Sequence, residues 1–305
     1  MRRQIQIIGV PADFGANRRG VDMGPSAIRY AGLGDELTQA GNETTDAGDL
    51  LVPRAEETEP ETDSVEGKAK FLPQVEGICS RLAEEVAEAI DNDLFPLVLG
   101  GDHSIAIGTI NGASQATDIG AIWFDAHGDF NTPETSPSGN VHGMPLAAVT
   151  GQGIFAGMEW ANATNLPEGN VVIVGLRNVD EEERNALKQS SISVFTMSDI
   201  DERGMKSVVE DAIDIATHGV DGIHVSLDLD WVDPNDAPGV GTPVRGGVTY
   251  REAHTALEAV ADRDKEQNVL RSMDIVEVNP ILDSSNRTAE LATELAASAL
   301  GKRII

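Results

Sequence analysis

The chain has 305 residues, enough for a large α/β core, and no apolar stretch of about 18 residues, so we expect no membrane span. Its 51 acidic residues outnumber 22 lysines and arginines and give a net charge of −29, which should repel nucleic acids and anionic membranes. The single cysteine, Cys79, excludes an intrachain disulfide and favours a reducing, cytoplasmic location.

Short β-branched runs alternate with helical patterns along the whole chain, which is typical of a parallel sheet flanked by helices. The predicted strands are 4–10, 96–99, 120–124, 171–174, 193–196, 222–227 and 272–276. The predicted helices are 25–32, 74–90, 104–116, 181–189, 205–216, 250–261 and 288–300. No break in composition and no internal repeat divides the chain, so we expect residues 1–305 to form a single domain.

Several segments between these elements have the composition of surface loops. Residues 48–67 are acidic and contain proline, and we expect them to follow the surface. Residues 131–143 and 231–247 are rich in Gly, Pro and Ser, and such loops at a catalytic rim often select the substrate. Residues 13–25 are a further candidate rim loop, and they lack a phosphate-loop pattern.

Six side chains of metal-binding type follow apolar, strand-like runs. An Asp, a His and an Asp occupy positions i, i+2 and i+4 after the run 119–124, so an extended backbone would project them to one side. Two aspartates repeat the i, i+2 spacing after 222–227, and another histidine follows 96–99. In chain order, the six residues are His103, Asp125, His127, Asp129, Asp228 and Asp230.

The joint occurrence of these clusters predicts a binuclear metal site. A single Asp-x-His is more often a turn, and a lone histidine after a strand is more often structural. Three such clusters at strand ends are a different case, because open α/β sheets build their ligand crevices there. Oxygen-rich ligation with some imidazole favours Mn²⁺, although Zn²⁺, Co²⁺ or Fe²⁺ are alternatives. Two ions that share a water lower its pKa from about 15.7 towards about 7.

The clusters belong to longer motifs that resemble a known family. The motifs are Gly100-Gly-Asp-His103, Asp125-Ala-His-Gly-Asp129, Ser138-Gly-Asn-Val-His-Gly-Met-Pro145, Ser226-Leu-Asp-Leu-Asp230 and Asp274-Ile-Val-Glu-Val-Asn-Pro280. With Gly20-Val-Asp-Met-Gly-Pro25, they cover most of the chain in the order found in ureohydrolases, the arginase and agmatinase family. The chain looks most similar to the bacterial arginases of that family, so residues 1–305 are expected to be one ureohydrolase domain.

The resemblance implies a three-layer α/β/α sandwich around a mainly parallel sheet of about eight strands. It implies two Mn²⁺ ions, the first held by His103, Asp125, Asp129 and Asp228. The second ion would be held by His127 and Asp230, with shared contacts from the carboxylates of residues 125 and 228. Homologues of this type assemble as homotrimers or homohexamers.

The activity implied by the resemblance is hydrolysis of L-arginine to L-ornithine and urea by a metal-bridging hydroxide. Asp129 would accept a hydrogen bond or proton from the nucleophile, and His142 matches the family's proton-shuttle histidine. Glu277 matches the carboxylate that orients the guanidinium. From the residues alone, a loop histidine before a glycine such as His142 more often caps a backbone turn. For Glu277, near the buried sheet, a cationic substrate would supply the partner that a buried carboxylate needs, and a structural salt bridge with a nearby arginine is the alternative.

Agmatinase is the main alternative within the family, because agmatine lacks the α-carboxylate of arginine. Neutral donors for a carboxylate would come from Asn131, Ser136 and Ser138, and anions for an α-ammonium from Asp180 and Glu183. Each also fits an ordinary loop or capping role, Asp180 as a helix N-cap above all. A further candidate in the pocket is Thr242, and the chain departs from the family's usual Asp at Asn178, in the region expected to recognise the amino group.

Two other functional classes remain open. Zinc-dependent deacetylases share the fold but keep one metal ion, whereas the paired aspartates and the extra histidine of this chain argue for two. A non-enzymatic role would most simply follow the loss of a ligand, and none of the six is missing. Separately, the net charge of −29 would destabilise a folded chain in dilute buffer, which suggests a halophilic protein from a salt-rich cytoplasm.

Overall fold

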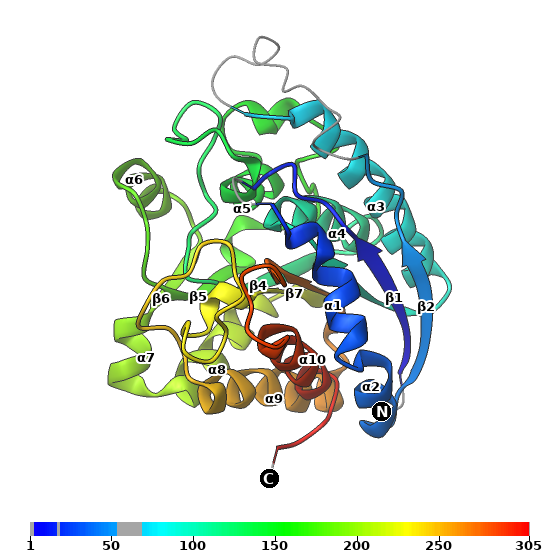
Figure 1. Cartoon of the computed structure of the whole chain (residues 1–305). Coiled ribbons are helices and arrows are strands. Elements are labelled where there is room, and N and C mark those ends of the chain that lie inside the picture. Colours follow the sequence, from blue (N-terminus) through cyan, green and yellow to red (C-terminus); the bar gives the residue numbers. More distant parts are fainter. Residues whose placement is uncertain (1–2, 17–18, 54–68, 305) are drawn as a thin grey trace.

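An eight-stranded parallel sheet forms the centre of the computed structural model, which describes residues 3–16, 19–53 and 69–304 (Figure 1). The strands are β1 (Gln4–Val10), β2 (Glu43–Asp49), β3 (Phe95–Gly100), β4 (Ile119–Phe124), β5 (Val171–Leu176), β6 (Ser193–Thr196), β7 (Gly222–Asp228) and β8 (Leu270–Val276). Their order is β2-β1-β3-β8-β7-β4-β5-β6, and all neighbouring pairs are parallel.

Helices cover both faces of this sheet. They are α1 (Gly24–Tyr30), α2 (Leu33–Gln39), α3 (Leu72–Asp91), α4 (Ala106–Ala113), α5 (Pro145–Val149), α6 (Glu181–Gln189), α7 (Met197–Arg203), α8 (Met205–Ala216), α9 (Tyr250–Gln267) and α10 (Arg287–Ala299). Short 3-10 helices are η1 (Val21–Met23), η3 (His103–Ile105), η4 (Val141–Gly143), η5 (Gly153–Gly157), η6 (Glu168–Asn170) and η7 (Leu229–Trp231). None of the helices in the described part of the chain combines the length and apolar character that a membrane span requires.

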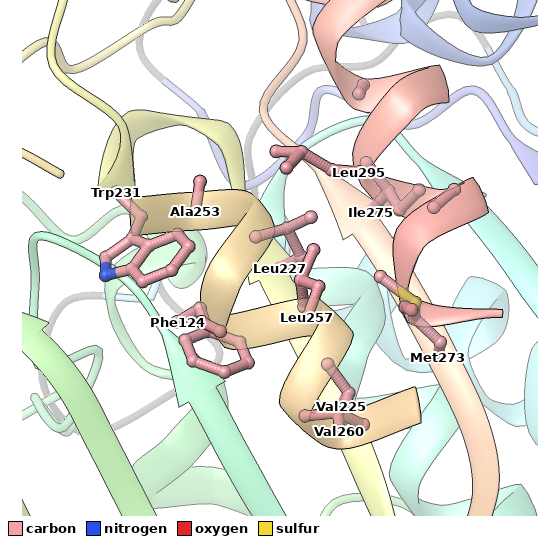
Figure 2. Close-up of a cluster of buried hydrophobic side chains, with 14 of the residues drawn as sticks. Phe124, Val225, Leu227, Trp231, Ala253, Leu257, Val260, Met273, Ile275 and Leu295 are labelled. Carbon is pink, nitrogen blue, oxygen red and sulfur yellow. The ribbon is translucent and has the colours of Figure 1, made fainter. Parts of the chain in front are cut away.

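Two apolar cores separate the three layers. One core lies between the sheet and α1, α2, α8, α9 and α10, and the other lies between the sheet and α3, α4 and α5 (Figure 1). Figure 2 shows the first core at β7 and β8, where alternate strand residues pack on α9 and α10: Val225, Leu227, Met273, Ile275, Ala253, Leu257, Val260 and Leu295. The predicted α/β/α sandwich with about eight parallel strands is confirmed.

The apolar patterns predicted seven of the eight strands, with ends that shift by one or two residues. The missed strand is β2, whose side chains are polar and mostly exposed because it is an edge of the sheet. The missed helices α2, α5 and α7 have five to seven residues, too few for a helical period to stand out. Residues 54–67 of the predicted acidic loop and residues 17–18 of the first rim loop lie outside the described residues.

Candidate metal centre and substrate site

The carboxyl ends of three strands, β3, β4 and β7, lead into the predicted metal ligands, and β8, between β3 and β7, leads into Glu277. In the sheet β3, β8, β7 and β4 are adjacent and parallel, so the segments that follow them begin at one edge. Helix η3 follows β3, helix η7 follows β7, and an irregular segment follows β4. The structure brings six side chains together there, those of His103, Asp125, His127, Asp129, Asp228 and Asp230. Of these six, His127 is partly exposed to solvent and the other five are buried.

The backbone around these ligands differs from the extended strand that their spacing predicted. Strand β4 ends before Asp125, and Asp129 has a φ of 49°, so side-chain alternation does not place the cluster. Instead, the Asp125 carboxylate accepts a hydrogen bond of 2.7 Å from the backbone N–H of His127. The Asp228 carboxylate accepts one of 2.7 Å from the N–H of Asp230. Two turns closed by aspartate side chains therefore direct these ligands.

His103 is at the centre of the first ligand group. Its Nδ1 atom lies 2.9 Å from Asp129 Oδ2 and 3.2 Å from Oδ2 of both Asp125 and Asp228. Oxygens of three carboxylates therefore lie within 3.2 Å of one nitrogen. The ligand atoms of His103, Asp125 and Asp129 also lie within 4.8 Å of one another.

His127 belongs to a second group that shares one residue with the first. Its Nδ1 atom lies 3.0 Å from Asp230 Oδ2 and 3.5 Å from Asp125 Oδ1. Asp125 therefore offers Oδ2 to the His103 group and Oδ1 to the His127 group. Thr242 lies beside this group, and its hydroxyl donates to Asp230 Oδ2 at 2.9 Å.

The hydrogen bonds of His103 test whether the site fits a metal ion. Ser226 donates its one hydroxyl hydrogen to Asp274 Oδ1 at 2.6 Å, so its oxygen must accept from His103 Nε2 at 2.7 Å. A neutral His103 then has a bare lone pair on Nδ1, facing three carboxylates. Both His103 Nδ1 and Asp129 Oδ2 are buried without a hydrogen-bond partner among the described residues. A divalent cation would satisfy these atoms, so the donor set fits one.

The protonation equilibria of the ligands point the same way. Burial, followed by repulsion from neighbouring carboxylates, raises the pKa of Asp129 to about 6 and the pKa of Asp228 well above its ordinary value. Although burial opposes it, the nearby Asp230 and Asp125 raise the pKa of His127 to about 12. So many buried anions are stable together only with compensating positive charge, which protons or metal ions supply.

His142 and Glu277 form a pair next to the His103 group. Glu277 has a φ of 64°, and its Oε1 accepts a hydrogen bond of 3.0 Å from the backbone N–H of His103. The same oxygen lies 3.0 Å from His142 Nδ1, so the partner of Glu277 is a histidine rather than the arginine of the alternative interpretation. Despite the burial of both groups, this contact raises the pKa of His142 to about 9 and lowers the pKa of Glu277.

The second oxygen of Glu277 has a different environment. Oε2 is buried and has no hydrogen-bond partner within the described ranges. Glu277 lines a cavity of about 400 Å³, which shares lining residues with a cavity of about 200 Å³ beside the metal ligands. Residues common to the two cavities are His127, His142, Asn178 and Thr242.

Three of the predicted substrate-binding residues form a connected wall of the smaller cavity. Asn131 donates from Nδ2 to Asp180 Oδ2 at 2.8 Å, and Asp180 caps helix α6 by accepting from the N–H of Glu183 at 2.9 Å. Glu183 accepts from the N–H of Phe130 at 2.9 Å, and burial raises its pKa to about 8. Asp180 therefore has the capping role of the alternative interpretation and also faces the cavity.

The two predicted serines lie farther out. Ser136 Oγ accepts from the N–H of Gly139 at 2.9 Å, and Ser138 Oγ accepts from the N–H of Asn140 at 3.1 Å. Neither serine is among the described residues that line the two cavities. The bonds that they make are those of loop turns, and their substrate contacts stay a prediction.

Asn178 lines the smaller cavity together with Asp180 and Glu183, the residues predicted to recognise the amino group, and it also contacts a metal ligand. Its Nδ2 lies 3.2 Å from Nε2 of His127, the ring nitrogen opposite the ligand atom. Asn178 thus contacts a metal ligand as well as the cavity. The position therefore bears on the metal centre directly.

Two residues that sequence reasoning missed support the ligands. Arg177 donates to the carbonyls of Asp230 at 2.6 Å and Val244 at 2.8 Å, which fastens the loop carrying Thr242 to the end of β5. Trp123 donates to Asp125 at 2.9 Å. Their only sequence signals were an arginine directly after a buried strand and a tryptophan two residues before a ligand.

The comparisons with known proteins agree with this geometry. The Arginase family model matches residues 3–301. An arginase of Bacillus subtilis is 49% identical over 308 residues and aligns over 100% of both chains. The native structure of Bacillus caldovelox arginase has a TM-score of 0.91, 44% identity and 100% coverage of both chains. The Entamoeba histolytica arginase in complex with L-ornithine has a TM-score of 0.86, 31% identity and 99% coverage of both. The chain belongs to the arginase family, close to its bacterial members.

Proposed function

We propose that this protein is a hydrolase that cleaves the guanidino C–N bond of L-arginine and releases L-ornithine and urea. The observation that carries the proposal is the gathering of six metal-binding side chains, four of which line the smaller cavity, next to an adjoining cavity that Glu277 lines. Full-length relatives at 45–49% identity are arginases, which supports the same activity. The solved relative from Entamoeba histolytica holds L-ornithine, the expected product.

Two Mn²⁺ ions are the proposed cofactors. His103, Asp125, Asp129 and Asp228 would hold the first, and His127, Asp230 and the shared Asp125 and Asp228 the second. Two groups of potential ligands that share Asp125 support this division. When bound, the ions supply an activated water as the nucleophile.

The protein's own groups orient the substrate and move protons. Glu277 Oε2, buried and without a partner, is placed to accept a hydrogen bond from the planar guanidinium. Asp129 would accept a hydrogen bond or proton from the nucleophile, as the resemblance implied, because its carboxylate lies among the proposed ligands of the first ion. His142, held by Glu277 and facing the cavity, would deliver a proton to the departing amine of ornithine.

The α-carboxylate and α-ammonium of arginine would bind at the wall of the smaller cavity. Asn131 and Thr242 offer neutral groups, and Asp180 and Glu183 offer carboxyl groups for the ammonium. We include Ser136 and Ser138 as donors to the carboxylate from the loop above, as the resemblance implied. Agmatine carries no carboxylate, so this wall favours arginine.

The setting of the enzyme is proposed on the same basis. We infer a cytoplasmic, salt-adapted homotrimer or homohexamer that acts in arginine metabolism. The lone buried cysteine and the net charge of −29 support the location and the salt adaptation.

Urea release from L-arginine and from agmatine, measured on Mn²⁺-loaded protein in molar KCl, tests the proposed function. We expect turnover of arginine and little or none of agmatine. An Asp129→Asn or His127→Asn variant should lose most of this activity, because each removes a proposed ligand. Turnover of agmatine alone would identify an agmatinase, and full activity of both variants would contradict the metal-centred mechanism.

A further inference from the structure

A row of buried polar side chains extends from the metal centre into the middle of the sheet. His224 and Ser226 on β7 pair in register with Ser272 and Asp274 on β8, and all four are 0% exposed. The opposite faces of the same strands carry the apolar side chains of Val225, Leu227, Met273 and Ile275, which Figure 2 shows. Polar groups in a doubly covered sheet cost stability. Packing alone therefore does not account for this row.

The row is a continuous chain of contacts that begins at a metal ligand. His103 Nε2 lies 2.7 Å from Ser226 Oγ, and Ser226 donates to Asp274 Oδ1 at 2.6 Å. Asp274 Oδ2 lies 3.3 Å from His224 Nε2, and His224 Nδ1 lies 2.8 Å from Ser272 Oγ. The ring of His103 thus connects, through four side chains, to the centre of the sheet.

The chain has a direction that the charge of Asp274 sets. A carboxylate only accepts hydrogen bonds, so Ser226 must point its hydrogen at Asp274. The serine oxygen is then an acceptor, and His103 must carry its hydrogen on Nε2. This leaves the lone pair of His103 on Nδ1, the atom that faces three carboxylates. His224 Nε2 lies 3.3 Å from the second oxygen of Asp274, which is ion-pair distance, although neither atom has a hydrogen bond of good geometry among the described residues.

We propose that Asp274 and His224 are positioning residues that fix the ring of His103, through Ser226, in the tautomer and orientation that bind the first metal ion. This inference rests on the proposed function, because it presupposes a metal ion at His103. Outer partners of a metal-bound histidine commonly change metal affinity by about 10- to 100-fold. Among the described residues, no such chain of contacts reaches His127, whose Nε2 lies beside the exposed side chain of Asn178.

The test is the binding of Mn²⁺ to metal-free protein. Titration calorimetry and the electron paramagnetic resonance signal of bound Mn²⁺ measure this binding. The variants are Asp274→Asn, Ser226→Ala and His224→Gln. His254→Gln is a matched control, because His254 is also 0% exposed and also places Nδ1 2.8 Å from a serine hydroxyl, that of Ser298. It lies between α9 and α10, away from the metal ligands.

We expect each of the three variants to lower the affinity for one of the two Mn²⁺ ions by about 10- to 100-fold. The affinity for the other ion should stay within about threefold of the parent's. The control should bind both ions like the parent. If Asp274→Asn does not fold, the affinities of Ser226→Ala decide the question. This variant removes one buried oxygen and leaves the carboxylate of Asp274 next to His224. Parent-like affinities in the variants, or equal losses at both ions, would overturn the inference. A parent that binds no Mn²⁺ would instead refute the proposed function.

Discussion

Glu277 shows how one residue can combine two tasks through its two oxygens. Its Oε1 is occupied by the His103 N–H and by His142, which fixes the side chain. Its Oε2 is buried without a partner in the part of the chain that the structure describes. A carboxylate held in this way is prepared for a cation, and Glu277 lines the cavity of about 400 Å³.

Replacing Glu277 by glutamine should lower kcat/KM for L-arginine by about two to three orders of magnitude, because a buried cation without its anion loses about 2–5 kcal/mol. Glutamine keeps the size and an acceptor for the His103 N–H, so Mn²⁺ binding should change little. Steady-state urea release measures the effect, with the exposed Glu290→Gln as control. A kcat/KM within threefold of the parent would contradict the assigned role.

Glu183 should make the stability of the protein depend on pH. Its pKa is raised from 4.5 to about 8 in the folded state, mainly by burial, so the folded state binds more protons than the unfolded state between these values. The free energy of unfolding therefore falls as pH rises from 4.5 to 8, by up to roughly 1.4 kcal/mol per pH unit. Glu183→Gln should remove this fall.

Urea denaturation of the parent and Glu183→Gln at a series of pH values in constant salt measures the difference. Glu181→Gln, an exposed neighbour on α6, should keep the parent's pH dependence. Parallel stability curves for the parent and Glu183→Gln would show that this carboxyl group is ionised normally in the folded protein.

The residues of the site were predictable where side chains of metal-binding type directly follow an apolar, strand-like run. The spacing of Asp125, His127 and Asp129 after an apolar run located the ligands, although turns and not strand alternation bring them together. The row behind His103 escaped prediction because Ser226 and Asp274 were treated only as parts of motifs. Polar residues at alternate positions of strands buried on both faces were the signal that was available.

At the scale of elements, the N-terminus of α9 has the capping box that the sequence predicted, and its contribution to the free energy of unfolding can be measured. Thr249 accepts from the N–H of Glu252, and the Glu252 side chain accepts from the N–H of Thr249, which completes the predicted capping box. The helix continues past its predicted end to Gln267, because a polar but helix-favouring sequence runs on until Asn268 adopts a φ of 53°.

Thr249→Ala should reduce the free energy of unfolding by about 1 kcal/mol, since it leaves backbone N–H groups at the start of α9 without an acceptor. Thr255→Ala on the same helix should have a smaller effect, because its hydroxyl only donates back to the carbonyl of Arg251. Chemical denaturation of both variants makes the comparison. An equal loss, or none at Thr249, would contradict the capping account.

The missed elements share a physical cause. Strand β2 at the sheet edge needs no apolar face, and its Asp46 and Asp49 pair with Arg29 of α1 rather than with the core. The helices α2, α5 and α7 are short, and their tertiary neighbours rather than their own patterns fix them.

At the scale of the whole molecule, the net charge of −29 dominates the surface. We expect the melting temperature to rise by roughly 5 °C or more between dilute buffer and 1–2 M KCl, because screening shortens the Debye length from about 10 Å to about 3 Å. Calorimetric or circular-dichroism melts measure it. A melting temperature that stays constant or falls would argue against salt adaptation.

The central claim is that the six ligands at the carboxyl ends of β3, β7 and β4 bind two metal ions, with Asp125 shared between them. Anomalous X-ray diffraction at the manganese absorption edge, on crystals of Mn²⁺-loaded protein, tests it most directly. The account predicts two peaks, one beside His103 Nδ1 and one beside His127 Nδ1, with Asp125 in contact with both. A single peak, or peaks away from these two histidines, would contradict it.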